Sequence, residues 1–201
     1  AAGAVDHVHF ENGDWKYTTI ENEKPLGLCG SGLIDLIAEL LKNHLIDSSG
    51  KLIQSKSSFT LIEPDESRDF NGVYLTQKDI GEVQQAKAAI AAGIILLCKK
   101  MGIEIEDIEE ILIAGAFGNY MRASSACRIG LLPAELFDRI HMIGNAAGEG
   151  AQIAVLNEPE YDRSGGLHER VEFLELAADP AFNDTYVDEL MFLDENDYEL
   201  V

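Results

Sequence analysis

The stretch LIAGAFGNYM, residues 112–121, is an apolar run that continues into two glycines and an asparagine. Leu112 to Ala114 predict a strand, and Gly115 marks the point where that strand ends. Because glycine has no Cβ, it either permits a tight turn or lets a flat ligand approach the backbone closely. This stretch alone leaves both interpretations open.

Two further glycine clusters stand, like this one, where a predicted helix begins. The first is GLCGSG (27–32), and its helix is expected to start just after Gly32 and to end near Asn43. The second is GNAAGEG (144–150), and its helix is expected to start at Asn145. Helix starts present unpaired N–H groups and a partial positive charge, which suit phosphates and other anions. For each cluster alone a turn is the simpler explanation, and close helix packing would equally explain the last two glycines of the second.

Strands and helices alternate along the second half of the chain. The predicted elements are a fully buried strand in EILIAG (110–115), a short helix in RASSACRIGLL (122–132) and a strand in RIHMIG (139–144). With the helix that follows, the order over residues 108–157 is β-α-β-α, which implies parallel strands with covering helices. In such sheets ligands collect beyond the carboxyl ends of the strands, where Gly115 and Gly144 are expected.

The longest predicted helix follows Thr76 and closes a helix-rich region over residues 30–102. Thr76 and Asp79 form a capping-box pattern, and Gly102 supplies a C-terminal stop. The last turns of this helix are apolar nearly all round, so it is expected to be buried. Its many alanines leave a thin surface against which a neighbouring element can pack closely.

The remaining segments carry weaker patterns. Near the N-terminus, alternating runs on either side of Asn12-Gly13 predict a β-hairpin over residues 5–20. The polar, turn-rich stretch between the two long helices predicts a loop with a short hairpin. The tail over residues 164–201 predicts one amphipathic helix, a break at Pro180 and a final apolar segment.

The composition is that of a globular protein with a strong negative charge. Of 201 residues, 46% are hydrophobic and 25% are charged, and the formal net charge is −21. Such a surface repels nucleic acid and anionic membranes, so neither is an expected partner. The most apolar run, AAIAAGIILLC, is too short to span a bilayer. Three widely separated cysteines fit a reducing cytoplasm, and the lack of an initiator methionine leads us to expect a piece of a longer protein.

Several polar side chains suggest ligands but have simpler interpretations. His7 and His9 share one face of a strand, a spacing that metals use, but without a third ligand a solvated strand face is the better interpretation. His141 lies in a buried strand pattern and is expected in the core. Asp35 and Glu39, one helical turn apart, predict an ordinary polar stripe.

Five stretches together resemble one protein family, in order and with similar spacing over nearly the whole chain. They are GLCGSGLIDLIAELL, LTQKDIGEVQQAKAAIAAGI, ILIAGAFGNYM, RIGLLP and IGNAAGEGA. The family is the C-terminal part of the reductive activators of corrinoid-dependent enzymes, which are ATP-dependent proteins of methyltransferase and O-demethylase systems. The resemblance places the chain in the actin, sugar-kinase and heat-shock ATPase superfamily.

The resemblance implies an α/β fold, namely an actin-like ATPase (ribonuclease H-like) lobe. Its expected parts are a parallel or mixed sheet, covering helices and the N-terminal β-hairpin. The lobe is incomplete relative to the full two-lobed fold, because phosphate- and metal-gripping loops of the DIGT or DxGG type do not occur in these 201 residues. No catalytic residue and no metal ligand is therefore assigned.

Within the superfamily, LIAGAFGN resembles the adenosine-binding segment, and GNAAGEGA resembles the second connecting helix between the lobes. Gly115 and Ala116 are then small because adenine or ribose lies against the backbone, while Gly118 turns the chain and Asn119 offers a hydrogen bond. Phe117 either stacks on the ligand or, as the preferred interpretation, fills the core. The expected cofactor-binding residues are Gly30, Ser31, Gly32, Gly115, Ala116, Phe117, Gly118, Asn119, Gly144 and Asn145.

The implied function is ATP-driven reduction of an inactive Co(II) corrinoid on a partner protein to Co(I), in the cytoplasm. The complete protein would bind ATP with Mg²⁺, an N-terminal domain outside this chain would hold a [2Fe-2S] cluster, and an upstream donor would supply electrons. The chain alone is expected to be inactive, and a homodimer through the alanine-rich helix or the acidic tail remains open. Two alternatives are an acidic docking module that binds the corrinoid protein without nucleotide, and one lobe of a small-metabolite kinase.

Overall fold

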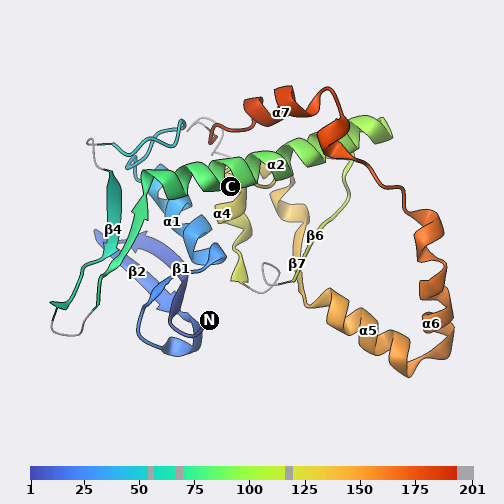
Figure 1. Ribbon diagram of the computed structural model, residues 1–201, viewed down its shortest axis with the longest axis horizontal. Coiled ribbons are helices and arrows are strands. Elements are labelled where there is room, and N and C mark those ends of the chain that lie inside the picture. Colours follow the sequence, from blue (N-terminus) through green and yellow to red (C-terminus); the bar gives the residue numbers. More distant parts are fainter. Residues whose placement is uncertain (54–56, 67–69, 116–119, 194–201) are drawn as a thin grey trace.

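The computed structural model describes residues 1–53, 57–66, 70–115 and 120–193 (Figure 1). The first three strands form one sheet in the order β2-β1-β3, with β1 antiparallel to β2 and parallel to β3. Their bounds are Ala4–Glu11 for β1, Asp14–Thr19 for β2 and Gly27–Leu28 for β3, and the single-turn helix η1 covers Ile20–Asn22. The predicted hairpin is confirmed, because Asn12 and Gly13 both adopt the positive φ that a tight turn between twisted strands requires.

Helix α1 (Gly30–Lys42) packs directly on β1. It begins at Gly30, so the predicted start after Gly32 was wrong by one turn, whereas the predicted end near Asn43 is confirmed by the C-cap. The early start follows from Cys29, whose carbonyl already accepts the Leu33 N–H.

The longest helix, α2 (Gln77–Met101), follows a second hairpin formed by β4 (Ser58–Ile62) and β5 (Val73–Thr76). Both sides of the predicted capping box are present between Thr76 and Asp79, and the C-cap Gly102 is left-handed. The expectation of burial, which rested on the apolar last turns, was wrong there, because Met101 is 70% exposed and Leu97 is also exposed. By length and composition alone α2 would be long enough to cross a membrane, yet one face packs in the core through Ala88 and Ala92.

Strands β6 (Ile111–Ala114) and β7 (Ile140–Gly144) form a parallel pair, as predicted. Between them lie α4 (Ala123–Arg128) and η4 (Ala134–Arg139). The single turn η3 (Ile105–Asp107) precedes β6. The prediction of a fully buried strand was wrong, since Leu112 is 54% exposed, and His141 is exposed rather than in the core. The reason is that only one face of the pair packs on the core, so the side chains alternate between buried and open positions.

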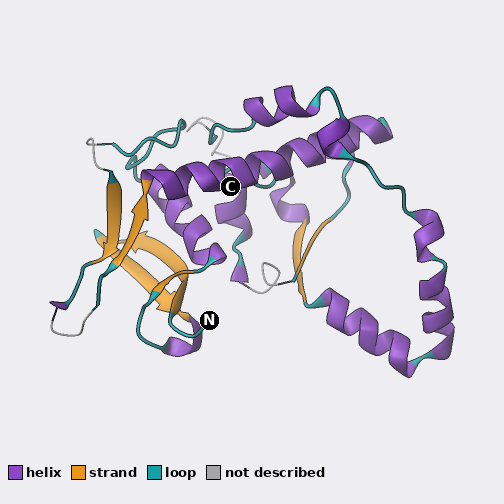
Figure 2. Cartoon of the chain, viewed as in Figure 1, coloured by secondary structure: helices purple, strands orange, loops and turns teal. Residues whose placement is uncertain are grey.

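The C-terminal part leaves the core after β7 and returns to it along α2 (Figure 2). Its elements are α5 (Ala146–Leu156), α6 (Glu158–Gly165), η5 (Leu167–Arg170), η6 (Leu176–Ala178) and α7 (Phe182–Asp188). The single amphipathic helix predicted after residue 164 was wrong, because two short turns and extended chain occupy that stretch. Phe173 in this stretch is 81% exposed, so in the described structure no neighbouring element packs against it to stabilise a helix. The predicted break at Pro180 is confirmed, because Pro180 lies between η6 and α7, and the helix α7 that follows it was not predicted.

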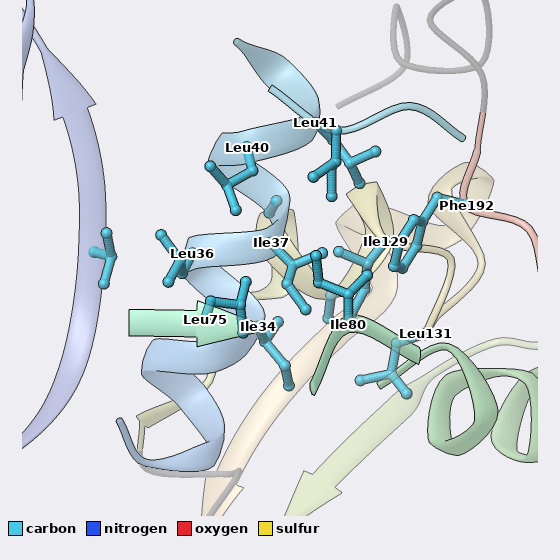
Figure 3. Packing of buried hydrophobic residues seen from close by; sticks show 14 of the residues in the cluster. Ile34, Leu36, Ile37, Leu40, Leu41, Leu75, Ile80, Ile129, Leu131 and Phe192 are labelled. Carbon is cyan, nitrogen blue, oxygen red and sulfur yellow. The ribbon is translucent and has the colours of Figure 1, made fainter. Parts of the chain in front are cut away.

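The hydrophobic core lies where α1, β5, α2 and the end of α4 meet (Figure 3). Helix α1 supplies its centre, because its apolar side chains recur every three or four residues and so share one face. The side chains at this junction include Leu36, Ile37, Leu40, Leu75, Ile80, Ile129 and Phe192. Phe192 closes the core from the end of the described chain and is held there by its N–H, which donates to the Ser48 carbonyl.

Candidate functional site

The two strands of the parallel pair end in glycines that contact each other. The Gly115 N–H donates to the Gly144 carbonyl at 2.7 Å, and both residues have positive φ, 80° and 60°. Only glycine adopts this conformation without strain, so the backbone geometry itself selects glycine at the two strand ends. The structure thus brings together two of the predicted site residues at the carboxyl edge of the sheet.

The backbone at Gly115 is open on the side where a Cβ would stand. No atom among the described residues lies within 4 Å of that position, and Ala114 and Gly115 are exposed. A flat ligand can therefore approach this peptide without displacing a side chain of the described chain. The predicted site residues Ala116, Phe117, Gly118 and Asn119 lie outside the described residues.

Asn145 is the N-cap of α5, and its side-chain oxygen accepts the Gly148 N–H at 3.1 Å. A Cβ at Gly148 would stand 2.4 Å from the Asn145 amide nitrogen, whereas nothing described lies within 4 Å of a Cβ at Gly150. Within the part of the chain that the structure describes, close packing against a second helix therefore accounts for neither glycine. Gly148 makes room for the cap, and the cap fixes where α5 starts beyond the strand end.

The first predicted cluster, Gly30 to Gly32, lies at the start of α1 against β1. The Ser31 hydroxyl donates to the Asp6 carbonyl at 2.9 Å, and a Cβ at Gly32 would stand 2.2 Å from the Val5 carbonyl oxygen. Ser31 and Gly32 are buried, and Gly30 is exposed. Close approach of helix to strand thus accounts for Ser31 and Gly32, and Gly30 is the residue of this cluster that faces solvent.

Asp35 is a buried polar centre that the sequence reasoning missed. Its side chain is 1% exposed, and its carboxylate accepts the Ser125 hydroxyl at 2.6 Å and the Val8 N–H at 3.3 Å. His7 Nδ1 lies 3.1 Å and an Arg122 guanidinium nitrogen 3.6 Å from the same carboxylate. The predicted polar stripe was therefore wrong for Asp35.

A local signal for this centre exists in the sequence. Asp35 follows Ile34 and precedes Leu36 and Ile37. All three neighbours are buried, so Asp35 interrupts the apolar face of α1. The residues that satisfy it lie 27 to 90 positions away along the chain, and no spacing rule predicts them. Among the described residues, no group of three His, Cys, Asp or Glu side chains is arranged to hold a metal ion.

A cavity of about 410 Å³ lies elsewhere, between α2 and the segment from Gly130 to Glu135. Its walls are largely apolar, and Glu106, Glu135 and Glu189 are among its lining residues. Burial and the nearby Glu135, which lines this cavity, raise the pKa of the Cys127 thiol to about 12. This thiol stays protonated at neutral pH, so it is not a nucleophile.

The sequence matches the profile of one protein family over residues 1–200, described as the C-terminal domain of RACo, the ASKHA domain. It is 38% identical over 210 aligned residues to the corrinoid activation enzyme RamQ of Eubacterium limosum. The alignment covers 96% of this chain and 35% of RamQ. It is 30% identical over 169 residues to a [Co(II) methylated amine-specific corrinoid protein] reductase of Methanosarcina barkeri, covering 83% of this chain and 29% of that protein.

The fold is similar to that of a solved structure of a reductive activator for corrinoid,iron-sulfur protein. The TM-score is 0.86 at 32% sequence identity, over 96% of this chain and 33% of that one. The chain therefore spans about a third of the length of these relatives.

Proposed function

The chain belongs to the family of the C-terminal ASKHA domain of RACo, and on this premise we propose that it is the C-terminal part of an ATP-dependent corrinoid activator. The complete protein would transfer one electron to an inactive Co(II) corrinoid on a partner protein and return it to Co(I). Two relatives support this proposal by name, since one is a corrinoid activation enzyme and the other a reductase of a Co(II) corrinoid protein. The fold, an actin-like α/β lobe, supports the use of ATP.

The observation that carries the nucleotide part of the proposal is the bare backbone at the strand ends. Gly115 and Gly144 meet at the carboxyl edge of a parallel pair, and the described structure leaves the Cβ position of Gly115 open. This geometry fits a purine or ribose laid against the Gly115 peptide, with Asn145 beside it. The resemblance assigns residues 116–119, which lie outside the described structure, to the same site. Gly30 offers a helix-start N–H, while Ser31 and Gly32 fix the start of α1 against β1.

The remaining parts of the activity belong to sequence outside this chain. We propose that the phosphate loops, the Mg²⁺ site and the [2Fe-2S] group lie there, so the chain alone does not turn over ATP. A nucleotide-driven change that shifts a conformational equilibrium by about 10⁴ is worth about 5.5 kcal/mol. At about 59 mV for each factor of ten, it moves a one-electron potential by roughly 240 mV. A shift of that size makes reduction of Co(II) by a cytoplasmic electron donor feasible.

A second candidate, an acidic docking module that binds the corrinoid protein, is favoured by one observation. The chain has a net charge of −21, and three glutamates line the apolar cavity beside α2. Such a surface complements a basic segment of a partner that also carries apolar side chains. Mixing the isolated chain with ATP and, separately, with the corrinoid protein distinguishes the two candidates by which one binds.

The substitution Gly115→Val tests the nucleotide site in a full-length protein that contains this chain. A branched side chain would occupy the space assigned to adenosine and should weaken ATP binding tenfold or more, at least about 1.4 kcal/mol. Valine at positive φ also strains the backbone, so Gly13→Val is the matched control, because Gly13 has φ 87° and equally open surroundings in the hairpin. Calorimetric titration with ATP measures both, and an unchanged affinity in Gly115→Val would refute the assignment.

A further inference from the structure

The cavity between α2 and the segment from Gly130 to Glu135 is not explained by the nucleotide site, since none of the described residues assigned to that site lines it. Its volume of about 410 Å³ lies in the range that is usual for ligand pockets. The last four residues of the stretch RIGLLP (128–133), to which the resemblance gives no role, supply one wall. Ala91 and Ile94 of α2 supply another. The cavity is therefore a second candidate site.

A third wall is the segment over residues 189–193, which follows α7 and lies along α2. Two of its side chains line the cavity. Its Leu190 and Met191 carbonyls accept hydrogen bonds from the side chains of Gln84 and Lys87 on α2. Because these contacts already hold the wall in place, a ligand that enters the cavity does not have to order it, which favours binding.

The charged residues that line the cavity are all acidic, namely Glu106, Glu135 and Glu189. The first two are exposed and Glu189 is half-buried, whereas Leu131 and Leu132 on the cavity wall are buried. In the part of the chain that the structure describes, none of the three glutamate side chains forms a hydrogen bond or an ion pair. The cavity thus combines an apolar interior with carboxylates that face solvent at its edge.

Two basic residues lie close to the cavity, but neither lines it. The Lys87 ammonium donates to a backbone carbonyl of the 189–193 wall and is attracted by Glu189. The Arg139 guanidinium donates to the Glu106 carbonyl. Against these two cations stand the three lining glutamates and, in the stretch 104–110 that contains Glu106, four further acidic residues. The edge of the cavity therefore keeps an excess of negative charge.

We propose that this cavity is a docking site for a segment of a partner protein that carries a lysine or arginine between apolar side chains. The methylene groups of such a side chain fit against Leu131 and Leu132, while its charged end reaches the glutamates at the edge. Nucleic acid and anionic membranes do not fit, because the same carboxylates repel them.

This inference rests on the proposed function, because it takes the corrinoid protein as the partner and names the part of this chain that binds it. Docking at the cavity accompanies nucleotide binding at the strand ends and does not replace it. The two sites use different residues, so they can be tested separately.

Calorimetric titration of a full-length protein with its corrinoid protein tests the cavity. Ala91→Trp places an indole in the space assigned to the partner and should weaken binding about tenfold or more. Ala89→Trp is the matched control, because Ala89 is an exposed residue of the same helix that does not line the cavity. It should leave the affinity unchanged.

A charge reversal tests the acidic edge independently of the cavity volume. Glu135→Lys should weaken binding about fivefold or more, and the remaining affinity should depend less on salt concentration than that of the wild-type protein. Glu82→Lys makes the same change at an exposed residue of α2 outside the cavity and should have less than about a twofold effect. Circular dichroism and thermal melting monitor folding, and if Ala91→Trp does not fold, Glu135→Lys at its exposed position carries the test.

Three results would overturn the proposal. Wild-type affinity in Ala91→Trp and Glu135→Lys would reject the docking site and leave the proposed function standing. If the wild-type protein does not bind the corrinoid protein at all, the proposed partner is rejected together with this site, and titration with ATP decides separately on the nucleotide part. Self-association of the wild-type protein that Ala91→Trp abolishes, measured by analytical ultracentrifugation, would assign the cavity to a second copy instead.

Discussion

Lys87 is a lysine almost completely enclosed by the fold, with 1% of its surface exposed. Its ammonium nitrogen donates to the Met191 carbonyl, and Gly130 leaves room for it, since a Cβ there would stand 3.1 Å from that nitrogen. Burial lowers the pKa of Lys87 below its ordinary value of 10.5, and the nearby Glu189 opposes this shift. Lys87 therefore links the C-terminal segment to α2 through its hydrogen bond to Met191, and burial of its ammonium group costs free energy of desolvation.

The sign of the pH effect follows from this shift. Between the folded pKa and 10.5 the unfolded chain binds more protons at Lys87 than the folded chain does, so the free energy of unfolding rises with pH. We expect Lys87→Met to lose this rise, so the wild-type chain gains relative to the variant between about pH 7 and about pH 10. The gain is about 1.4 kcal/mol for each tenfold difference in proton affinity between the two states.

Urea unfolding of both proteins at the two pH values measures this difference. Lys78→Met, at an exposed lysine on the same helix, is the control and should follow the wild-type pH dependence. A constant difference between wild type and Lys87→Met across the range would contradict the assigned pKa shift.

At the level of elements, the contact between α1 and β1 depends on Gly32. A Cβ at this residue would stand 2.2 Å from the Val5 carbonyl oxygen, and the strand backbone cannot move aside cheaply. We expect Gly32→Ala to cost about 1–3 kcal/mol of the free energy of unfolding, the usual range for overpacking. Gly81→Ala in α2 is the matched control, because nothing described lies within 4 Å and alanine should instead gain about 0.5–1 kcal/mol. Denaturant unfolding should show changes of opposite sign in the free energy of unfolding of the two variants. An unchanged free energy of unfolding in Gly32→Ala would argue against the described contact.

Elements whose signals are local could be predicted from the sequence. The Asn12-Gly13 turn and the Thr76 capping box depend on neighbours within a few residues, and both form as expected. Leu112 and Phe173 were misjudged because exposure depends on which distant element covers a side chain. The same limit applies to the candidate site, where the strand-end glycines could be predicted and Asp35, whose partners come from two other elements, could not.

On the scale of the whole molecule, an uncovered apolar surface accompanies α5 and the outer face of β6 and β7. Leu156 is 85% exposed, and Val155 and Ile153 on the same helix are also exposed. Several large apolar side chains exposed on one short helix mark a contact with another element or protein. The relatives are about three times as long as this chain, so we expect the remainder of such a protein to cover it.

The substitution Leu156→Asp tests whether α5 is exposed in the isolated chain and covered in a full-length protein. In the isolated chain the change should alter the free energy of unfolding by less than about 0.5 kcal/mol, because an exposed side chain has few contacts to lose. In a full-length protein it should cost more than about 2 kcal/mol, since a charge would replace a buried leucine. Gln152→Asp, at an exposed polar position of α5, serves as the control and should be mild in both. Equal effects of Leu156→Asp in the two proteins would mean that nothing covers this helix.

The parallel pairing of β6 and β7 also orders events in time as the chain folds. Parallel strands cannot be joined by a tight turn, so this pair can form only when the crossover through α4 and η4 brings its two strands together. The β1–β2 hairpin closes through neighbours in sequence and needs no such wait. We therefore expect the edge that holds Gly115 and Gly144 to form later in folding than the N-terminal hairpin.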